Sequence, residues 1–324
     1  MTTNPTILAL LRDEADLNIW QNDLAAIPGI VTVVISDPSP PSVQRACAAV
    51  PMSRFILLSG RFYPAEAPVV LEVIRKLHPA AEILLVSPAA APFPAVSPIL
   101  KDGIRNLIVV PALSPSDEER RRKSPLSIAI SSLADDARER ISTCLRPGTV
   151  AREFLLESSD QKETLIAHLV EAVGGSTAEA EFLRQRAALI ADEMIENALY
   201  GAPRDQRGSQ LFRKGEPRTI LPGERIMFRF GFDGENLAME LADGWGSLHP
   251  VEVVDHFSRN REREGLPPTE GGLGLFLIWR FIDHLHISIS PGRETVVSGH
   301  VRLRTPEDLS DAPGFHITTW RACA

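Results

Sequence analysis

The sequence has few of the features that mark disulfide-linked, zinc-binding or membrane-spanning proteins. It contains only 3 cysteines, Cys47, Cys144 and Cys323, and this scattered, odd set supports neither a disulfide framework nor a zinc site. No apolar run is long enough to span a bilayer, and residues 1–5 lack the basic and then apolar pattern of a signal peptide. We therefore expect a cytoplasmic protein that has no contact with a membrane.

Basic residues are also in the minority. The chain has 34 Lys and Arg against 42 Asp and Glu, and its formal net charge of −8 argues against direct binding of nucleic acid. An apolar share of 44% and a mean hydropathy of −0.02 indicate a folded chain with a substantial core. The length of 324 residues predicts two domains.

The first third of the chain alternates short apolar runs with helix-compatible stretches. We expect strands at 6–11, 30–35, 54–58, 81–86 and 106–110, and helices between them at 16–26, 42–49, 68–77 and 96–102. Strands that alternate with helices form a parallel sheet covered on both faces. The pattern therefore predicts an α/β, flavodoxin-like domain over 1–113.

The ends of these strands resemble the receiver domains of two-component signalling. Asp13 follows the first strand, Ser59 the third, Ser87 the fourth and Pro111 the fifth. The resemblance implies an acceptor Asp after the third strand and a Lys after the fifth, and both are missing. We interpret residues 1–113 as a pseudo-receiver used for docking or dimerisation; an unrelated doubly wound domain is the alternative.

A charged, proline-bounded segment follows, and we expect residues 114–157 to connect two domains, with a helix at 126–145. An amphipathic helix is predicted over 158–173, ended by Gly174 and Gly175. The second domain is expected to cover 158–305, and residues 306–324 to form a C-terminal tail.

The stretch from Asp192 to Tyr200 places polar groups on an otherwise apolar helix. Glu193 and Asn197 are spaced i and i+4, so their side chains lie on the same side, one turn apart. An Asn amide oxygen is a suitable ligand for Mg²⁺, and a carboxylate can orient or deprotonate a hydroxyl. A solvated polar pair on the edge of a helix is the alternative.

Two further motifs lie downstream. A hairpin over 225–241, turning at Asp233 and Gly234, leads into Asp243 and then Gly246. A helix is then expected near 251–257, followed by the polar segment 258–270. Glycines then precede an apolar helix, where exposed backbone N–H groups favour phosphate; this motif comprises Gly272, Gly274 and Leu275. Strands are predicted at 286–290 and 295–303.

In this order the motifs resemble the GHKL (Bergerat-fold) ATP-binding module, shared by histidine kinases and anti-sigma-factor serine kinases. They are Glu193-x-x-x-Asn197, Asp243-x-x-Gly246 and Gly272-x-Gly274-Leu275. The resemblance covers about residues 158–304 and implies a C-terminal α/β sandwich that binds ATP and Mg²⁺. The glycine pattern departs from the family, because Trp245 and Ser247 stand where it usually has glycine. This departure puts the affinity for nucleotide in doubt.

The resemblance also implies a role for each motif. Asn197 would coordinate Mg²⁺, Glu193 would act as the catalytic base, and Asp243 would bind the adenine amino group. Gly246, Gly272, Gly274 and Leu275 would line the nucleotide site, and residues 247–271 would form an ATP lid. Arginines 259, 261 and 263 of this lid either reach phosphate or are solvated.

The resemblance implies a signalling protein whose partner is a regulatory protein phosphorylated on Ser or Thr. A non-catalytic ATP-dependent switch or scaffold is one alternative, and an atypical histidine kinase with His168 as phosphoacceptor is another. Because His168 lacks a following acidic residue, a helix-surface histidine is its simpler interpretation. The sequence identifies neither the partner nor the signal, and it leaves open whether the chain forms a homodimer.

Overall fold

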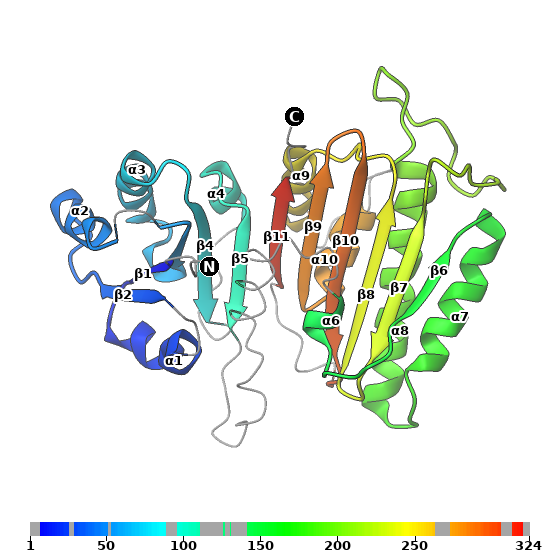
Figure 1. Cartoon of the computed structure of the whole chain (residues 1–324), viewed down its shortest axis with the longest axis horizontal. Coiled ribbons are helices and arrows are strands. Elements are labelled where there is room, and N and C mark those ends of the chain that lie inside the picture. The colour runs from blue at the N-terminus through cyan, green and yellow to red at the C-terminus, as the bar shows by residue number, and fades with distance from the viewer. Residues whose placement is uncertain are drawn as a thin grey trace, which may run out of the picture. The chain divides into compact units, whose positions relative to one another are not determined.

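The computed structural model describes residues 7–25, 29–50, 53–88, 96–110, 126, 130, 141–262, 273–305 and 313–319. The chain divides into two compact units, Met1–Asp136 (unit 1) and Ala137–Ala324 (unit 2), and the division falls inside the predicted connection 114–157. Both units combine helices with a sheet, so the predicted α/β class is confirmed (Figure 1). Among the helices of these ranges, none has both the length and the apolarity that crossing a bilayer requires.

The strands of unit 1 are parallel and lie in the order β2-β1-β3-β4-β5. Each strand is joined to the next through helical structure, as the alternating pattern predicts. The elements are β1 (Ile7–Leu11), α1 (Glu14–Ala25), β2 (Ile30–Val34), α2 (Pro40–Ala48), β3 (Phe55–Ser59), η1 (Gly60–Phe62), α3 (Ala67–Leu77), β4 (Glu82–Pro88), α4 (Val96–Lys101) and β5 (Asn106–Val110).

Apolar side chains on both faces explain why this sheet forms. Every residue of β1 and of β3 is buried, which requires cover on both sides of the sheet. One face packs against Trp20 and Leu24 of α1, together with Leu126 and Ile130. The loops at the strand ends are therefore attached to a packed core.

The strands of unit 2 lie in the order β11-β9-β10-β8-β7-β6. Neighbouring strands are antiparallel except for β11, which runs parallel to β9. The elements are α6 (Ile141–Cys144), β6 (Arg152–Leu155), η3 (Ser159–Gln161), α7 (Lys162–Ala172), α8 (Ala178–Glu196), η4 (Asn197–Gly201), β7 (Met227–Phe232), β8 (Asn236–Asp243), α9 (Pro250–Glu262), α10 (Gly274–Phe281), β9 (His284–Ser290), β10 (Glu294–Arg302) and β11 (Gly314–Thr319).

Helices cover the two faces of this sheet unequally. α7, α8 and α10 pack together on one face, whereas the short α6 lies on the other (Figure 1). Alternation along β8 explains the division: Met239 and Leu241 point to the helical layer, while Ala238 packs against Ile141 and Leu145 beside α6. Of the predicted site residues, Glu193 lies on α8, and Gly274 and Leu275 lie on α10, within this helical layer.

The structure differs from the sequence-based expectation at two edges of unit 2. β6 forms within the segment predicted as a connection, and β11 within the predicted tail. β6 is short and mostly exposed, so its composition carries little strand signal. β11 buries Phe315 and Ile317, but it pairs with β9, from which β10 separates it in the chain, and local pattern does not reveal such pairing.

Candidate functional site

The candidate site is built on α8, whose apolar stripe faces the core as predicted. The Thr177 side chain caps its start by accepting the Ala180 N–H at 3.2 Å, and Ala187, Ile190 and Met194 are buried. Glu193 is partly exposed beside this stripe, as is Asn197. The helix ends in the π-helical turn η4, which begins at Asn197; such turns are frequent at functional sites.

Gly274 brings the start of α10 against this pair. A Cβ added at Gly274 would lie 2.5 Å from Glu193 Oε2 and 3.3 Å from both Oδ1 and Nδ2 of Asn197. No side chain of the described residues caps α10, so its first N–H groups are available to a ligand. An amide, a carboxylate and a helix N-terminus therefore meet at one point, as the motif order predicts.

Arg186 fixes how the two helices are aligned, and the sequence reading missed it. Its Nη2 donates to the carbonyl of Phe281 at 2.6 Å and contacts Asp283 Oδ1 at 3.3 Å. Phe281 closes α10 and Gly274 opens it, so α8 holds α10 at both ends. Burial lowers the pKa of Arg186 to about 10, which leaves it charged at neutral pH.

The electrostatic setting of Glu193 suits a proton acceptor. Burial raises its pKa, and the carboxylates of Asp192 and Glu196 add to that rise, while the charge of Lys214 opposes it. A carboxyl whose pKa lies above its ordinary value is a better base for a hydroxyl proton. Glu193 is therefore the described residue best placed to act as a base beside Asn197.

Gly274→Ala tests this geometry. The new Cβ displaces the flexible end of Glu193, so we expect any reaction in which Glu193 acts as a base to slow by about tenfold or more, because a misplaced catalytic group is costly. The free energy of unfolding should change by less than about 1 kcal/mol, since Ala favours a helix over Gly. Rates and chemical denaturation measure the two effects.

Gly174→Ala is the matched control for this change, because a Cβ there meets nothing within 4 Å. Adding Glu193→Ala to Gly274→Ala removes the clash with the Glu193 carboxylate and should restore any ligand binding that Gly274→Ala weakens. An unchanged reaction rate in Gly274→Ala alone would show that the contact has no catalytic consequence.

Asp243 lies at the end of β8 on the helix-covered face, and it is 5% exposed. Burial raises its pKa to about 7, and the nearby Glu294 carboxylate adds to the rise, although the backbone N–H groups of Trp245 and Gly246 oppose it. The Trp245 N–H donates to Oδ1 at 2.9 Å. A buried carboxylate with this pKa is costly to the fold, which is typical of a group kept for function.

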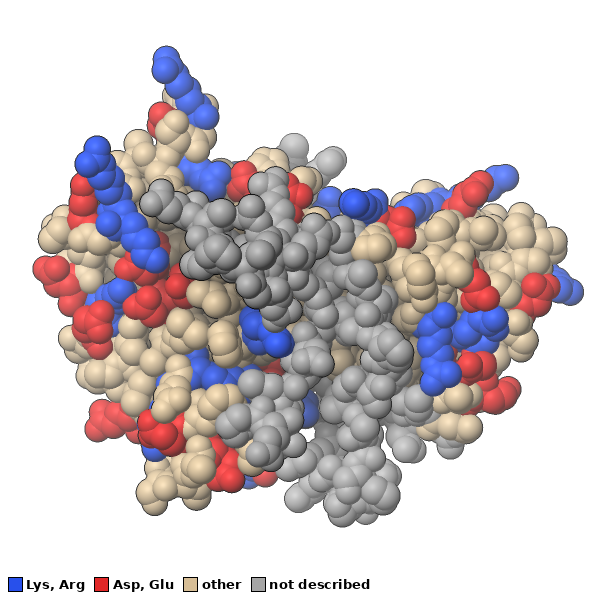
Figure 2. All heavy atoms as spheres, turned by 180° about the vertical axis from the view of Figure 1, so that it is seen from behind, with Lys and Arg blue, Asp and Glu red and all other residues tan. Residues whose placement is uncertain are grey.

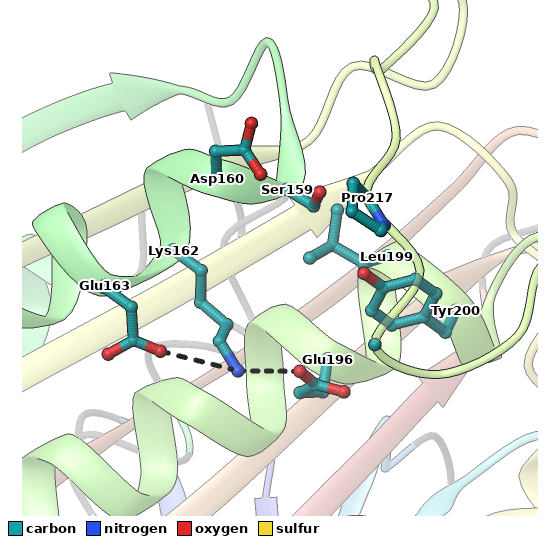
Figure 3. A pocket seen from close by; sticks show the side chains of 9 residues that line it. Ser159, Asp160, Lys162, Glu163, Glu196, Leu199, Tyr200 and Pro217 are labelled. Carbon is teal, nitrogen blue, oxygen red and sulfur yellow. Dashed lines mark hydrogen bonds and ion pairs between the residues drawn. The ribbon is translucent and has the colours of Figure 1, made fainter.

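The segment after Asp243 is attached to the end of the π-helical turn. Ser247 Oγ donates to the carbonyl of Ala202 at 2.7 Å, and η4 contacts β8. The motif of Asp243 and Gly246 therefore approaches the motif of Glu193 and Asn197. A cavity of about 380 Å³ elsewhere on α8 is lined by neither Asp243 nor Asn197 (Figure 3).

The glycines beside Asp243 support the backbone. Gly246 has φ +55°, and a Cβ added there would lie 2.6 Å from Arg293 N and 2.7 Å from Glu294 N. Gly244 faces the backbone of Gly223, whose carbonyl oxygen would lie 2.6 Å from an added Cβ. At both positions glycine is required by close packing of the backbone, which needs no bound nucleotide to explain it.

Part of the predicted third motif and lid can be placed. Gly272 lies outside the described residues, as does Arg263, and nothing is described of the side chains of Arg259 and Arg261. Leu275 is 8% exposed and belongs to the core side of α10. The predicted lid begins with α9, which is anchored because Phe257 stacks on Trp279 at 4.6 Å between ring centroids.

His168 is packed against the sheet. Its ring stacks on Phe154 of β6 with centroids 5.5 Å apart, and its Nδ1 is buried without a hydrogen-bond partner among the described residues. A phosphoacceptor nitrogen has to reach the γ-phosphate. This placement agrees better with a packed surface histidine than with a phosphoacceptor.

In unit 1, Arg61 lies against acidic residues that follow the first strand. Arg61 contacts Asp13 at 3.1 Å and the fully buried Asp16 at 3.0 Å. Ser59 donates to Asp16 at 2.5 Å. Ser87 lies beside Gly60, the residue after Ser59, since a Cβ added at Gly60 would be 3.2 Å from Ser87 Cβ. The predicted positions converge, whereas Asp16 and Arg61 were missed because no spacing rule singles them out.

Within the described ranges, no group of three or more His, Cys, Asp or Glu side chains is arranged to hold a metal ion. A Mg²⁺ ion bound through Asn197 would therefore take its other ligands from phosphate or water. The sequence matches no protein-family model, and a search of curated proteins gives no match either.

Proposed function

We propose that this chain is an ATP-binding signalling protein that phosphorylates Ser or Thr on a regulatory protein partner. The observation that carries the proposal is the meeting of Glu193 and Asn197 with the uncapped start of α10 at Gly274. A helix N-terminus binds phosphate, an amide oxygen binds Mg²⁺ and a carboxylate accepts a proton. These are the groups that transfer from ATP to a hydroxyl requires.

The proposal extends to the two folds. Unit 1 is a flavodoxin-like pseudo-receiver, which is supported by its parallel strand order β2-β1-β3-β4-β5. Unit 2 is a GHKL-type α/β sandwich, which is supported by one helical layer on a mostly antiparallel sheet and by the order of the motifs on it.

The residues present fit MgATP. Gly274 lets the start of α10 approach Glu193 and Asn197 closely, since a Cβ there would lie 2.5 Å from Glu193 Oε2. Asn197 would hold Mg²⁺ through its amide oxygen, and Asp243 would accept a hydrogen bond from the adenine amino group. When bound, MgATP would supply the phosphoryl group, with the partner's hydroxyl oxygen as acceptor and ADP as leaving group. Glu193 accepts the proton that this hydroxyl loses.

The Glu193→Gln and Glu193→Ala variants test the catalytic role. Because Glu193 is the proposed base, we expect phosphotransfer to fall by about 10² to 10⁴-fold, while MgATP affinity stays within about threefold. Transfer of labelled phosphate and calorimetric titration of MgATP measure the two quantities. Glu171→Gln, an exposed change on α7, is the control.

A non-catalytic switch is the second candidate, and Arg61 favours it. With Arg61 paired to Asp13 and Asp16, unit 1 already has a cation in its acidic site and lacks an acceptor Asp, which suits a docking module. If wild type and both Glu193 variants bind MgATP equally and none transfers phosphate to candidate partners, the switch replaces the kinase.

A further inference from the structure

The strand β2 is the outermost strand of unit 1 (Figure 1). It pairs with β1 on one side, in unbroken register from Ile30 to Val34, and no strand of the described residues pairs with its other side. An edge strand leaves backbone N–H and C=O groups without protein partners, so it can pair with a further strand. The outer side of β2 is therefore a candidate interaction surface, and the proposed kinase activity does not use it.

Two backbone hydrogen bonds to β1 show which groups of β2 point outward. The Ile7 N–H donates to the Gly29 carbonyl at 3.3 Å, and the Ile35 N–H donates to the Leu11 carbonyl at 2.7 Å. Along a strand, the backbone groups of successive residues point to opposite sides, so those at odd positions from 29 to 35 face β1. The residues between them point their N–H and C=O groups away from β1; they are Ile30, Thr32 and Val34.

The side chains of β2 do not block such pairing. All of them, from Ile30 to Val34, are uncharged and β-branched; Val31 is 37% exposed, and Thr32 is exposed as well. Edge strands that are protected against pairing carry charges or proline. β6, at the other end of the strand order, has such protection, because its Arg152 and Glu153 are charged and exposed. The sequence of β2 has none.

The order of side chains along β2 is symmetrical about Thr32. In two antiparallel copies related by a two-fold axis at Thr32, this residue faces its own counterpart, and Ile30 of each copy faces Val34 of the other. These are the residues whose backbone groups point outward, so each N–H meets a carbonyl of the other copy. Val31 then faces Val33 on the other side of the sheet. Every cross-strand pair is β-branched, and such pairs suit a sheet.

The strand is already held in the form that pairing requires. Ile30 and Val34 pack against the core of unit 1, so little freedom would be lost when a second strand is added. Figure 2, a view from behind, shows acidic and basic side chains close to one another on the surface of unit 1. This face therefore presents no large field of one sign that would repel an identical molecule.

We propose that the chain forms a two-fold symmetric homodimer in which the outer edge of β2 pairs antiparallel with β2 of a second copy, with Thr32 on the axis. A second copy is the occupant because β2 is complementary to itself in both its backbone groups and its side chains. One short strand buries less area than a standard interface, so we expect a dissociation constant of about 10–100 μM. The dimer does not depend on the proposed kinase activity.

Sedimentation equilibrium of the full chain, at concentrations on both sides of the expected dissociation constant, tests the dimer. Thr32→Lys places like charges opposite each other on the axis and should weaken dimerisation by about tenfold or more, and Thr32→Glu should do the same. An equimolar mixture of the two variants should dimerise again, because opposite charges then meet at the axis. Val69→Lys, which changes another exposed apolar residue of unit 1, should leave dimerisation unchanged.

Thr32→Pro is a second test that does not use charge. It removes the outward N–H at the axis and keeps every bond to β1, so it should also weaken dimerisation by about tenfold. A wild type that stays monomeric, equal dimerisation of wild type and Thr32→Lys, or a mixture that stays monomeric would each overturn the proposal. A separate titration with MgATP keeps the two proposals distinct, because a dimer without ATP binding would remove the kinase alone.

Discussion

Asp243→Asn is expected to stabilise the ligand-free protein at pH 8 and to weaken ATP binding by about ten- to hundredfold, the value of a hydrogen bond to a charged acceptor. Burial raises the pKa of Asp243 from 3.8 to about 7, so the folded state prefers the protonated carboxyl. Its contribution to stability is complete below the unfolded pKa and is lost as the pH rises through about 7. At pH 8 the ionised carboxylate costs up to about 4 kcal/mol, which Asn avoids.

Thermal unfolding at pH 5 and pH 8, with titration of MgATP, measures both effects. The gain in melting temperature should be larger at pH 8, because near pH 5 the folded wild type is mostly protonated at Asp243. If Asp243 binds the adenine amino group as proposed, ATP affinity of the wild type should likewise fall below pH 7, because Asp243 loses its charge there. In the Asp243→Asn variant the side-chain amide oxygen still accepts the Trp245 N–H, so the local turn is kept.

Asp233→Asn, in the same hairpin, is a control whose effect on stability at pH 8 is expected to be opposite to that of Asp243→Asn. Although burial opposes them, hydrogen bonds from the backbone N–H groups of Asn236, Glu235 and Arg146 lower the pKa of Asp233. Its stabilising effect is therefore present at neutral and higher pH, and Asp233→Asn should lose stability at pH 8 without affecting ATP. An Asp243→Asn protein that melts below wild type at pH 8 would contradict the argument, and unchanged ATP affinity would remove Asp243 from the nucleotide site.

Gly246→Ala is expected to destabilise unit 2 by about 2–5 kcal/mol, the sum of left-handed strain and overpacking. The strain arises because Gly246 has φ +55°. The overpacking arises because the new Cβ would lie 2.6 Å from Arg293 N and 2.7 Å from Glu294 N, which are backbone atoms of the β9–β10 turn and cannot rotate away. Denaturant unfolding measures the loss.

Gly292→Ala separates the backbone strain from the overpacking. Gly292 also has a positive φ, +67°, but an added Cβ there meets nothing within 4 Å. It should cost only about 1–2 kcal/mol of backbone strain. Equal losses for the two variants would mean that the turn yields to the new methyl group, and the packing role of Gly246 would then be discarded.

Local pattern was sufficient for the elements whose side chains carry a clear period. β1 and β3 are continuous apolar runs, α8 carries a three-and-four stripe, and the Asp233-Gly234 turn joins two alternating strands; each forms as expected. β6 and β11 were missed because their strand character depends on partners distant in sequence.

The residues of the candidate site also divide into those that local pattern predicts and those whose role depends on the tertiary structure. Spacing alone placed Glu193 and Asn197 together, because helix geometry fixes what lies four residues apart. Spacing could not show that Arg186 clamps α10 or that Gly246 supports a hairpin. Gly272, outside the described residues, and the nucleotide itself stay predictions.

By itself, the sequence determined the α/β class, the apolar stripes of α8 and α10, and the residue types available for phosphate, Mg²⁺ and a proton. These follow from hydrophobic period and side-chain chemistry, which are local. Only the tertiary structure decided that Gly274 meets Glu193 and that Arg61 neutralises the acidic site of unit 1, since both depend on contacts between segments far apart in the chain. Burial, which raises the pKa of Asp243, is likewise a property of the packed molecule, because only packing removes the carboxylate from water.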